Sequence, residues 1–331
     1  MLKLPNDTEI VAETLSDHLR REETSYPAAA VVRAISEACA EIAERLAAGG
    51  LPGDPAAIVG VNESGDKQKA LDVATHDYMV EVLRKAGVRQ VLSEEAENVI
   101  ALNSDGAFDV AIDPIDGSGS IGTGAPLGTL FTVIPAGPTG PEGFYQPGRK
   151  IAAAGYASFG HSADFGFSLG NGLHLAVFDW RIEEFRMWKE GHEVPNTSRV
   201  LAYNASNHRH WEPGIRQFVE DALEGKRGPL NADYNMRWLA AAVGDMHRIV
   251  LQGGLFLYPG DSRPGYEDGK LRLIYEAIPM AFLMEQAGGQ ATSGRVPILD
   301  MTPTSLHQNV PLIFGSSSLV ETLGAYLAFR A

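Results

Sequence analysis

The segment Asp113–Ser118, which reads DPIDGS, places two aspartates directly after an apolar run of strand length. Pro114 cannot continue a strand ladder, so Asp116 can turn back toward Asp113, with the Ile115 carbonyl between them. The glycine and serine that follow offer backbone N–H groups of the kind that bind phosphate. Hard divalent cations prefer such oxygen ligands, and Mg²⁺ is usually held by one or two carboxylates and a substrate phosphate. By itself the segment is equally consistent with a plain turn, because Asp-Pro and Asp-Gly are frequent turn dipeptides.

Further acidic residues at strand ends and helix starts favour the metal hypothesis. Glu94 and Glu95 follow a short apolar segment at 88–92, and Asp66 and Asp72 stand at the start of an amphipathic segment. Adjacent glutamates are commonly solvated surface residues. A pair at the carboxyl end of a strand is a better candidate, because α/β proteins tend to place ligands there.

The first half of the chain predicts helices packed on a sheet. Apolar residues at helical spacing predict helices over 28–48 and 66–86, and β-rich segments predict strands over 88–92, 108–113 and 127–135. Residues 150–188 predict several short strands, with a tight hairpin turn at Asn171-Gly172. The strand at 108–113 is expected to end where the acidic loop begins.

The second half predicts a layered α/β arrangement, because strands and helices alternate. Its expected strands are 199–204, 253–259 and 310–316, and its expected helices are 214–225, 237–251, 275–289 and a final helix. A polar segment after residue 189 marks the expected boundary. We therefore predict an N-terminal domain at 1–192, which carries the acidic loops, and a C-terminal α/β domain at 193–331.

Composition excludes several classes of protein. The 331 residues carry a net charge of −15, from 27 basic and 42 acidic residues, which disfavours nucleic acid and anionic membranes as partners. No apolar run approaches the roughly 18 residues of a membrane helix, and the first residues lack a secretory apolar region, so we expect a cytoplasmic protein. The single cysteine, Cys39, excludes an intrachain disulfide and is expected to be a buried filler in its helix.

DPIDGS, preceded by LSEE, resembles the metal signature of the Mg²⁺-dependent, lithium-sensitive sugar-phosphatase superfamily, and within it the class 1 fructose-1,6-bisphosphatase family. Matching segments follow in order along nearly the whole chain: GDKQKALDVATHD (65–77), VLSEEAE (91–97), DPIDGS (113–118), PGRKIAAAGYASFG (147–160), GDMHRIVLQGGLFLYP (244–259), GKLRLIYEAIPMAFLMEQAGG (269–289) and PTSLHQNVPLIFGS (303–316). GKLRLIYE separates this family from the smaller inositol monophosphatases. The resemblance implies an α+β sugar-phosphatase fold with stacked helix and sheet layers (αβαβα).

The resemblance also implies a role for each matching residue. Two or three Mg²⁺ ions, with Mn²⁺ as a substitute, would bind Glu94, Glu95, Asp113, the carbonyl of Ile115, Asp116 and Glu276. Glu95 and Asp72 would help to deprotonate the attacking water, with Asp66 close by. Residues of the acidic loop (Asp116, Gly117, Ser118 and Gly119) would contact the phosphate that is cleaved.

The remaining substrate contacts would come from the second half. Asn204, Tyr258, Lys270 and Arg272 would bind the sugar and the retained phosphate, and Arg237 would reach into the site of a neighbouring subunit. Structural roles are open for two of them, since Tyr258 could be core packing and Arg237 a surface ion pair. Lys270 and Arg272, two apart on an expected strand, should face one side and bind an anion.

Two departures from the family pattern concern specificity and regulation. Trp238 replaces a common tyrosine, Ala240–Ala242 replaces a Gly-Ser-Met run, and Asn207 replaces another tyrosine, which predicts a looser second sugar-phosphate subsite. The positions that bind AMP in inhibited relatives are Ala107, Phe108 and Pro135 here, and none of them can pair with a phosphate. We therefore expect the protein to be insensitive to AMP.

The resemblance implies Mg²⁺-dependent hydrolysis of the 1-phosphate of D-fructose 1,6-bisphosphate to fructose 6-phosphate and phosphate, by a homotetramer. One alternative is a sedoheptulose-1,7-bisphosphatase or a bifunctional sugar bisphosphatase, which the looser subsite keeps open. A non-catalytic regulatory homologue is a further alternative, which the intact set of acidic residues argues against. The sequence leaves a gluconeogenic and a carbon-fixing (Calvin cycle) role equally open.

Overall fold

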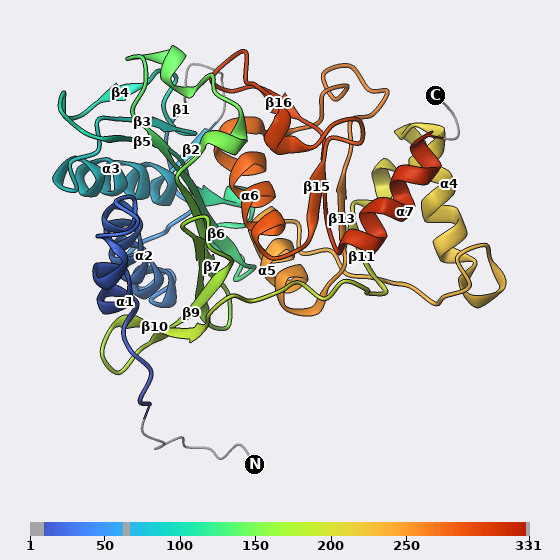
Figure 1. The fold of residues 1–331 in the computed structure, drawn as a ribbon, viewed down its shortest axis with the longest axis horizontal. Helices are drawn as coiled ribbons and strands as arrows, with labels where there is room; N and C mark the ends of the chain where they lie inside the picture. Colours follow the sequence, from blue (N-terminus) through green and yellow to red (C-terminus); the bar gives the residue numbers. More distant parts are fainter. Residues whose placement is uncertain (1–9, 62–66, 329–331) are drawn as a thin grey trace.

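A computed structural model describes residues 10–61 and 67–328, which form five stacked layers of helices and sheets (Figure 1). Helices α1 (Leu15–Glu22), α2 (Ala29–Ala47) and α3 (Ala70–Lys85) form the outer layer at one end. An eight-stranded sheet, a helical layer, a five-stranded sheet and a second outer helical layer follow in turn. The arrangement confirms the predicted α+β fold with αβαβα layers.

The eight-stranded sheet contains the strands that end at the acidic segments. Its order is β10 (Glu184–Lys189), β9 (His174–Asp179), β8 (Ala163–Ser168), β7 (Ala153–Phe159), β6 (Leu127–Pro135), β5 (Phe108–Asp116), β3 (Gln90–Ser93) and β4 (Ile100–Ala101). Neighbouring strands are antiparallel except β3 and β5, which run parallel. The parallel pair brings the residues after β3 beside the carboxyl end of β5.

The second half of the chain forms the other three layers. The five-stranded sheet has the order β12 (Asn235–Met236), β11 (Val200–Tyr203), β13 (Leu255–Tyr258), β17 (Leu312–Gly315) and β15 (Gln290–Thr292). Helices α5 (Ala242–Gln252) and α6 (Ile278–Gln286) lie between the two large sheets, and α4 (Pro213–Leu223) and α7 (Ser317–Ala328) cover the far side. Two short ribbons complete the structure: β1 (Ile58–Val61) with β2 (Lys67–Lys69), and β14 (Leu271–Arg272) with β16 (Asn309–Val310).

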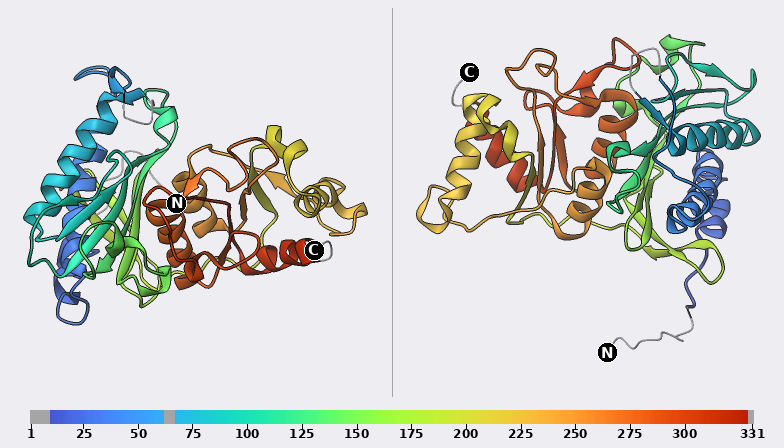
Figure 2. Two further views of the ribbon diagram at one scale, coloured as in Figure 1. Left: turned by 90° about the horizontal axis from the view of Figure 1, so that it is seen from above. Right: turned by 180° about the vertical axis from the view of Figure 1, so that it is seen from behind.

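Apolar residues fill both faces of the eight-stranded sheet. One core cluster joins α1, α2 and α3 to this sheet, and it includes Cys39, which is fully buried as predicted. A second cluster joins the other face, through Leu130 and Tyr156, to apolar residues of α5 and α6 such as Met246 and Met280. The two halves of the chain therefore share one core, and the views from above and from behind both show them packed side by side (Figure 2).

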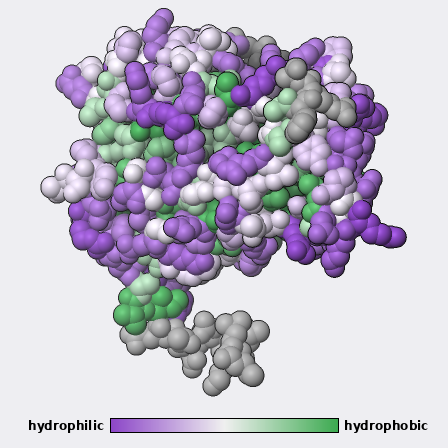
Figure 3. Space-filling view, turned by 45° about the vertical axis from the view of Figure 1, so that its right-hand side comes forward, coloured by the Kyte–Doolittle hydropathy of each residue, from purple (hydrophilic) through white to green (hydrophobic). Residues whose placement is uncertain are grey.

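The surface is largely hydrophilic on the face drawn in Figure 3, with apolar side chains scattered between charged ones. The most exposed large apolar residues include Leu51, Val11 and Leu223. In the described part of the chain, no helix combines the length and the apolar character needed to cross a membrane.

Several elements differ from the sequence predictions. Helix α3 begins at Ala70, later than predicted, because residues 67–69 pair as a strand. Helix α5 begins at Ala242, because Ala240 has a positive φ of 62° that breaks the helical run predicted from residue 237. Helix α1 was not predicted, since it is short and buries only Leu15, His18 and Leu19.

The predicted turn at Asn171-Gly172 is also wrong in detail. Strands β8 and β9 do form a hairpin, but five residues separate them. Positive φ angles fall on Gly170 (90°) and Gly172 (105°) rather than on adjacent residues. The wider loop places its two left-handed residues at separate glycines, whereas a two-residue type I′ turn would need positive φ at both Asn171 and Gly172.

Candidate active site

A β-bulge brings the two aspartates of the acidic segment to one side. Strand β5 does not end at Asp113 as predicted. It resumes at Asp116, with Asp113 opposite Leu130 and Asp116 opposite Gly128 on β6. One extra residue is therefore present in β5, and it lies where Pro114 lacks a backbone donor. Residues three apart on a regular strand face opposite sides, so the bulge is what allows both carboxylates to meet.

Glu276 completes the cluster from a distant part of the sequence. It lies in the π-helical turn Leu273–Ala277, directly before α6, and its carboxylate accepts a hydrogen bond from the backbone N of Arg272. Carboxylate oxygens of Asp113, Asp116 and Glu276 all lie within 4.8 Å of one another, and all three residues are buried. The structure thus assembles three of the predicted metal ligands in one place.

Other predicted acidic residues surround this cluster. Glu94 follows β3, and its backbone N donates to the carbonyl of Ile112 at 3.1 Å. Glu95 accepts a bond of 3.5 Å from Gln68 Nε2. Asp72 lies in the first turn of α3 and is only 4% exposed. Asp66, the remaining predicted catalytic acid, lies outside the described residues.

Burial among like charges raises the pKa values of these carboxyls. Burial, and then the neighbouring Glu94, raise the pKa of Asp113 well above its usual range. The same two causes act on the pKa of Glu276. Burial raises the pKa of Glu94 to about 7 and that of Asp116 to about 6, although a backbone bond from Val243 to Asp116 opposes the second shift.

Asp72 has the environment of a general base. Burial, followed by repulsion from Glu95, raises its pKa to about 6. Its Oδ1 atom is buried and has no hydrogen-bond partner among the residues that the structure describes. A carboxylate oxygen in that state can accept a proton from a bound water, and a pKa near neutrality suits that task.

The donor set fits a hard divalent cation. Every ligand atom in the cluster is a carboxylate oxygen, and unneutralised acids at such short separations are costly to bury. Burial raises the pKa of both Glu94 and Glu276, and the positive charge of Arg272 opposes that rise. One guanidinium does not neutralise three buried acids and the half-buried Glu94, so the site has an excess of negative charge that one or more metal ions would balance.

The loop after β5 carries the candidate phosphate donors. Gly117 has a φ of 84°, and a Cβ atom there would lie 2.9 Å from the Cβ of Ala241. Ser118 begins a short 3₁₀ turn, and the carbonyl of Ser118 accepts a bond of 2.6 Å from Lys69 Nζ. Gly119 is exposed. The tight approach at Gly117 fixes this loop against the start of α5.

Sequence reasoning missed two residues that hold this loop and its acid. Val243, at the start of α5, donates its backbone N–H to Asp116 Oδ2 at 2.7 Å. Lys69 Nζ donates to the Ser118 carbonyl of the same loop. The lysine stood within the matched segment GDKQKALD, but no local signal indicates that Val243 lies next to Asp116, because 127 positions separate them.

The predicted sugar-side cations have separate partners. Arg272 donates to the carbonyl of His307 at 2.8 Å and to Asn309 Oδ1 at 3.0 Å, and it lies beside the acids. Lys270 lies just before β14, is exposed, and places its Nζ 4.1 Å from the centroid of the Tyr266 ring. Arg272 is therefore fixed by its hydrogen bonds, whereas Lys270 presents its ammonium at the surface.

The other predicted contacts lie near strand ends of the five-stranded sheet. Tyr258 ends β13 and is half-buried, and the ring of Trp238 stacks on it at 6.2 Å between centroids. Asn204 follows β11 and accepts bonds from the backbone N and the hydroxyl of Ser206. The exposed side chain of Arg237 donates to the carbonyl of Met236 at 3.2 Å.

Comparisons with known proteins agree with this architecture. A family model described as the fructose-1-6-bisphosphatase N-terminal domain matches residues 11–190, and its C-terminal counterpart matches residues 194–328. The chain is 47% identical over 322 residues to the class 1 fructose-1,6-bisphosphatase of Brucella anthropi, covering 97% of this chain and 94% of the relative. A Brucella suis relative of the same name is 47% identical over 320 residues, with 97% and 94% covered.

A solved structure is similar over the same extent. The crystal structure of Leishmania major fructose-1,6-bisphosphatase in holo form has a TM-score of 0.87 and 28% identity, covering 96% of this chain and 99% of that one. Fold, buried acids and relatives together define an enzyme of the hydrolase class. The chain belongs to the fructose-1,6-bisphosphatase family.

Proposed function

We propose that this enzyme removes the 1-phosphate of D-fructose 1,6-bisphosphate with Mg²⁺ as its cofactor, giving fructose 6-phosphate and phosphate. The family acts on a sugar bisphosphate and uses a divalent metal. The observation that carries the proposal is the buried cluster of Asp113, Asp116 and Glu276 beside a glycine-rich loop. Such a cluster suits metal-dependent phosphoryl transfer, which needs positioning and charge neutralisation more than covalent chemistry.

In this proposal the metal ligands are Glu94, Glu95, Asp113, the Ile115 carbonyl, Asp116 and Glu276. When bound there, two or three Mg²⁺ ions would neutralise the phosphate and lower the pKa of a water molecule, and Mn²⁺ would substitute. Asp72 Oδ1 supports the assignment, since a buried acceptor without a partner in the described chain can receive the proton of that water. We assign the same role to Glu95, and to Asp66 on family resemblance alone.

The chain's own groups would hold the substrate from both halves. Gly117, Ser118 and Gly119 would contact the phosphate that leaves as the P–O bond to the sugar breaks. Lys270 and Arg272 would bind the retained phosphate, and Tyr258 and Asn204 would bind the sugar. Arg237, whose side chain is exposed, would complete the site of a neighbouring subunit in a homotetramer.

A phosphate-release assay on a panel of sugar phosphates, with and without Mg²⁺, tests the proposal. We expect turnover of fructose 1,6-bisphosphate only with the metal, and loss of at least about 10³-fold in kcat for Glu95→Gln and Asp116→Asn. Asp105→Asn is a matched control, because Asp105 is an exposed acid away from the cluster. Retention of full activity in either site variant would refute the metal assignment.

A second substrate, sedoheptulose 1,7-bisphosphate, is favoured by one observation. Trp238 stacks on Tyr258 and on Phe256, so its indole lies beside a residue proposed to bind the sugar. We infer that the stacked indole of Trp238, together with the small side chains of Ala241 and Ala242, accommodates a longer sugar. The ratio of kcat/KM for the two bisphosphates measures this, and Trp238→Tyr should shift the ratio toward fructose 1,6-bisphosphate. An unchanged ratio would show that Trp238 does not select the sugar.

We also propose that AMP does not regulate the enzyme. Phe108 lies opposite Pro135 in the β5–β6 ladder, and Ala136 N donates to the Ala107 carbonyl, so these three positions do lie together. The nearby guanidinium of Arg89 is engaged by Asp109 and by two backbone carbonyls. We expect no inhibition by micromolar AMP at saturating Mg²⁺, and inhibition under those conditions would contradict the proposal.

A further inference from the structure

A second group of metal-type ligands lies away from the acid cluster, where α1 meets the edge of the eight-stranded sheet. His18 is on α1, His174 begins β9, and Glu190 follows β10. One ligand atom from each lies within 4.8 Å of the others. Two imidazoles and one carboxylate are a different donor set from the all-oxygen cluster of the active site.

We propose that His18, His174 and Glu190 form a binding site for a first-row transition cation, of which Zn²⁺ is the best fit. Imidazole nitrogen suits zinc rather than Mg²⁺, and three protein ligands with one open position are a common zinc arrangement. The proposal is independent of the bisphosphatase reaction, because none of the three residues is among the proposed catalytic or substrate-binding groups.

His174 has a nitrogen available for such an ion. Its side chain is buried, with 7% of the residue exposed, and Nδ1 has no hydrogen-bond partner in the described chain. Its Nε2 lies 3.3 Å from Asn171 Oδ1, so a proton on Nε2 leaves a lone pair on Nδ1. Phe167 stacks on the imidazole at 5.2 Å between centroids, which fixes the plane of the ring.

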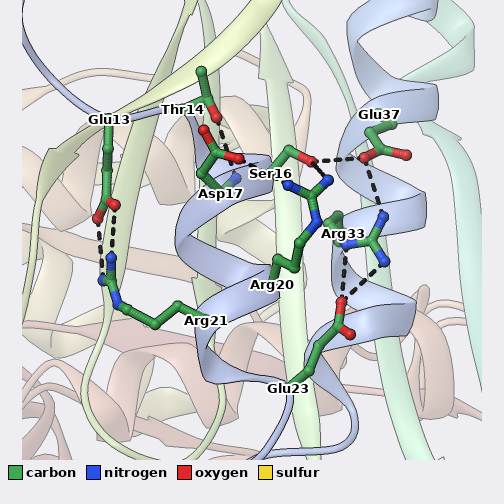
Figure 4. A network of polar contacts seen from close by, with 9 residues as sticks. All are labelled: Glu13, Thr14, Ser16, Asp17, Arg20, Arg21, Glu23, Arg33 and Glu37. Carbon is green, nitrogen blue, oxygen red and sulfur yellow. Dashed lines mark hydrogen bonds and ion pairs between the residues drawn. The ribbon is translucent and has the colours of Figure 1, made fainter.

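The imidazole of His18 contacts a carboxylate through one ring nitrogen, as many metal-ligating histidines do. Its Nδ1 lies 2.9 Å from Glu13 Oε1, and in the tautomer that carries its proton on Nδ1, toward this carboxylate, Nε2 is free to be the ligand atom. A carboxylate behind the imidazole is the usual partner of a histidine that binds zinc. Arg21 Nη2 also lies 3.0 Å from His18 Nδ1. The Arg21 guanidinium donates to both carboxylate oxygens of Glu13, as Figure 4 shows.

Backbone hydrogen bonds hold the three elements together without a metal. Met187 N on β10 donates to the Glu13 carbonyl at 3.0 Å, next to the start of α1. His192 N donates to the Leu173 carbonyl at 2.7 Å, which ties the segment after Glu190 to the start of β9. Ligand atoms around a tetrahedral zinc lie roughly 3.3 Å apart, so the exposed Glu190 side chain needs only a small movement to complete the site.

The local charge also favours a cation. The carboxylates of Glu22 and Glu190 interact electrostatically with His174, and the Glu13 carboxylate contacts His18 Nδ1. The one guanidinium among them is Arg21, which pairs with Glu13 at 2.7 Å and lies 3.7 Å from Glu22. Three acids against one base leave the site with a net negative charge before any metal binds.

Cobalt absorption separates this site from the active site. The full chain, stripped of metal and supplied with excess Mg²⁺, is titrated with Co²⁺ and then with Zn²⁺. Tetrahedral cobalt with nitrogen ligands absorbs visible light strongly, whereas cobalt on six oxygens absorbs weakly. We expect one equivalent of the strong band per chain, displaced by one equivalent of Zn²⁺, and a melting temperature raised by Zn²⁺.

Variants decide which residues bind. His174→Gln and Glu190→Gln should each weaken Zn²⁺ binding at least about 100-fold, and Glu13→Gln should weaken it about 10–100-fold. His161→Gln, which changes an exposed histidine outside the group, should leave the band unchanged. Glu190→Gln alters an exposed side chain, so it reports on binding even where His174→Gln fails to fold. Absence of the strong band in the unmodified protein, or its persistence in Glu190→Gln, would overturn the proposal.

Discussion

Asp113 shows why the acid cluster is unstable in the absence of a cation. It is 2% exposed, and its carboxylate lies among those of Glu94, Asp116 and Glu276. Its Oδ1 accepts a hydrogen bond of 3.0 Å from the backbone N of Ile115, which offsets only part of the cost of burial. A proton or a metal ion must therefore neutralise part of this charge.

Repulsion among these carboxylates makes the stability of the metal-free protein depend on pH. Carboxyls whose folded pKa is raised bind protons in the folded state that the unfolded state has already released. For Asp72, Asp116 and Glu94 this difference in bound protons spans a pH window, from a pKa of about 4 in the unfolded chain to a pKa of about 6 or 7 in the folded one. Their contribution therefore lowers stability as pH rises through that window.

Asp113→Asn tests the prediction, because it removes one charge and keeps the acceptor for Ile115. In EDTA at pH 8 we expect the variant to be more stable than the wild type by about 1–3 kcal/mol, seen as a melting temperature higher by about 2–5 °C. The difference should vanish near pH 4, where the carboxyls are protonated. With saturating Mg²⁺ the order should reverse. A variant that melts at or below the wild type in EDTA at pH 8 would contradict the repulsion.

At the scale of elements, the site depends on the contact between the loop after β5 and the start of α5. Asp116 accepts the N–H of Val243, and Gly117 lies against Ala241. Negative charge is favourable at a helix N-terminus, so α5 stabilises the ionised form of Asp116. The bulge in β5 and the first turn of α5 thus fix the carboxylate of Asp116 together.

Gly117→Ala should break this contact. Its φ of 84° is unfavourable for alanine, and the added Cβ would approach Ala241 to 2.9 Å. We expect a loss of about 1–3 kcal/mol in the free energy of unfolding and a fall of more than about 10-fold in kcat. Urea unfolding and steady-state kinetics measure both effects.

Gly119→Ala is the matched stability control in the same loop. A Cβ at Gly119 would meet no atom within 4 Å, and its φ is not in the left-handed region. Its free energy of unfolding should stay within about 0.5 kcal/mol of the wild type. Equal destabilisation by both substitutions would show that the contact with Ala241 is not the cause.

For the whole molecule, the shared core predicts cooperative unfolding of the two halves. The cluster that contains Leu130 and Tyr156 from the eight-stranded sheet also contains Met246 and Met280 from α5 and α6. A bond of 2.8 Å between the Tyr156 hydroxyl and His247 Nδ1 joins the same layers. Separating the halves would expose this apolar surface, so neither half is expected to stay folded alone.

Tryptophan fluorescence can follow each half separately. Trp180 and Trp188 lie in or beside β9 and β10, whereas Trp211 and Trp238 lie in the second half. We expect the double variants Trp180→Phe/Trp188→Phe and Trp211→Phe/Trp238→Phe to show fluorescence transitions in urea that coincide with their own circular dichroism transitions. Well-separated fluorescence and circular dichroism midpoints within one variant would show that the predicted boundary near residue 192 separates independent domains.

Local sequence signals were enough to predict most of the secondary structure and the main acidic residues of the candidate site. Alternation and helical spacing located most strands and helices, and strand β6 (Leu127–Pro135) was predicted to the residue. The clustering of Asp113, Asp116 and Glu94 at strand ends indicated cation chemistry, because parallel strands deliver such residues to one edge. Residue type and short-range spacing were sufficient for these predictions.

Only the tertiary structure decided how those residues meet. The bulge at Pro114 depends on pairing with β6, the N–H of Val243 reaches Asp116 across 127 positions, and α5 begins only after the positive φ of Ala240. His18, His174 and Glu190 share no local pattern, yet packing of α1 on the sheet brings their ligand atoms within 4.8 Å. Contacts between distant segments arise from burying a common core, and a single sequence carries no short-range record of them.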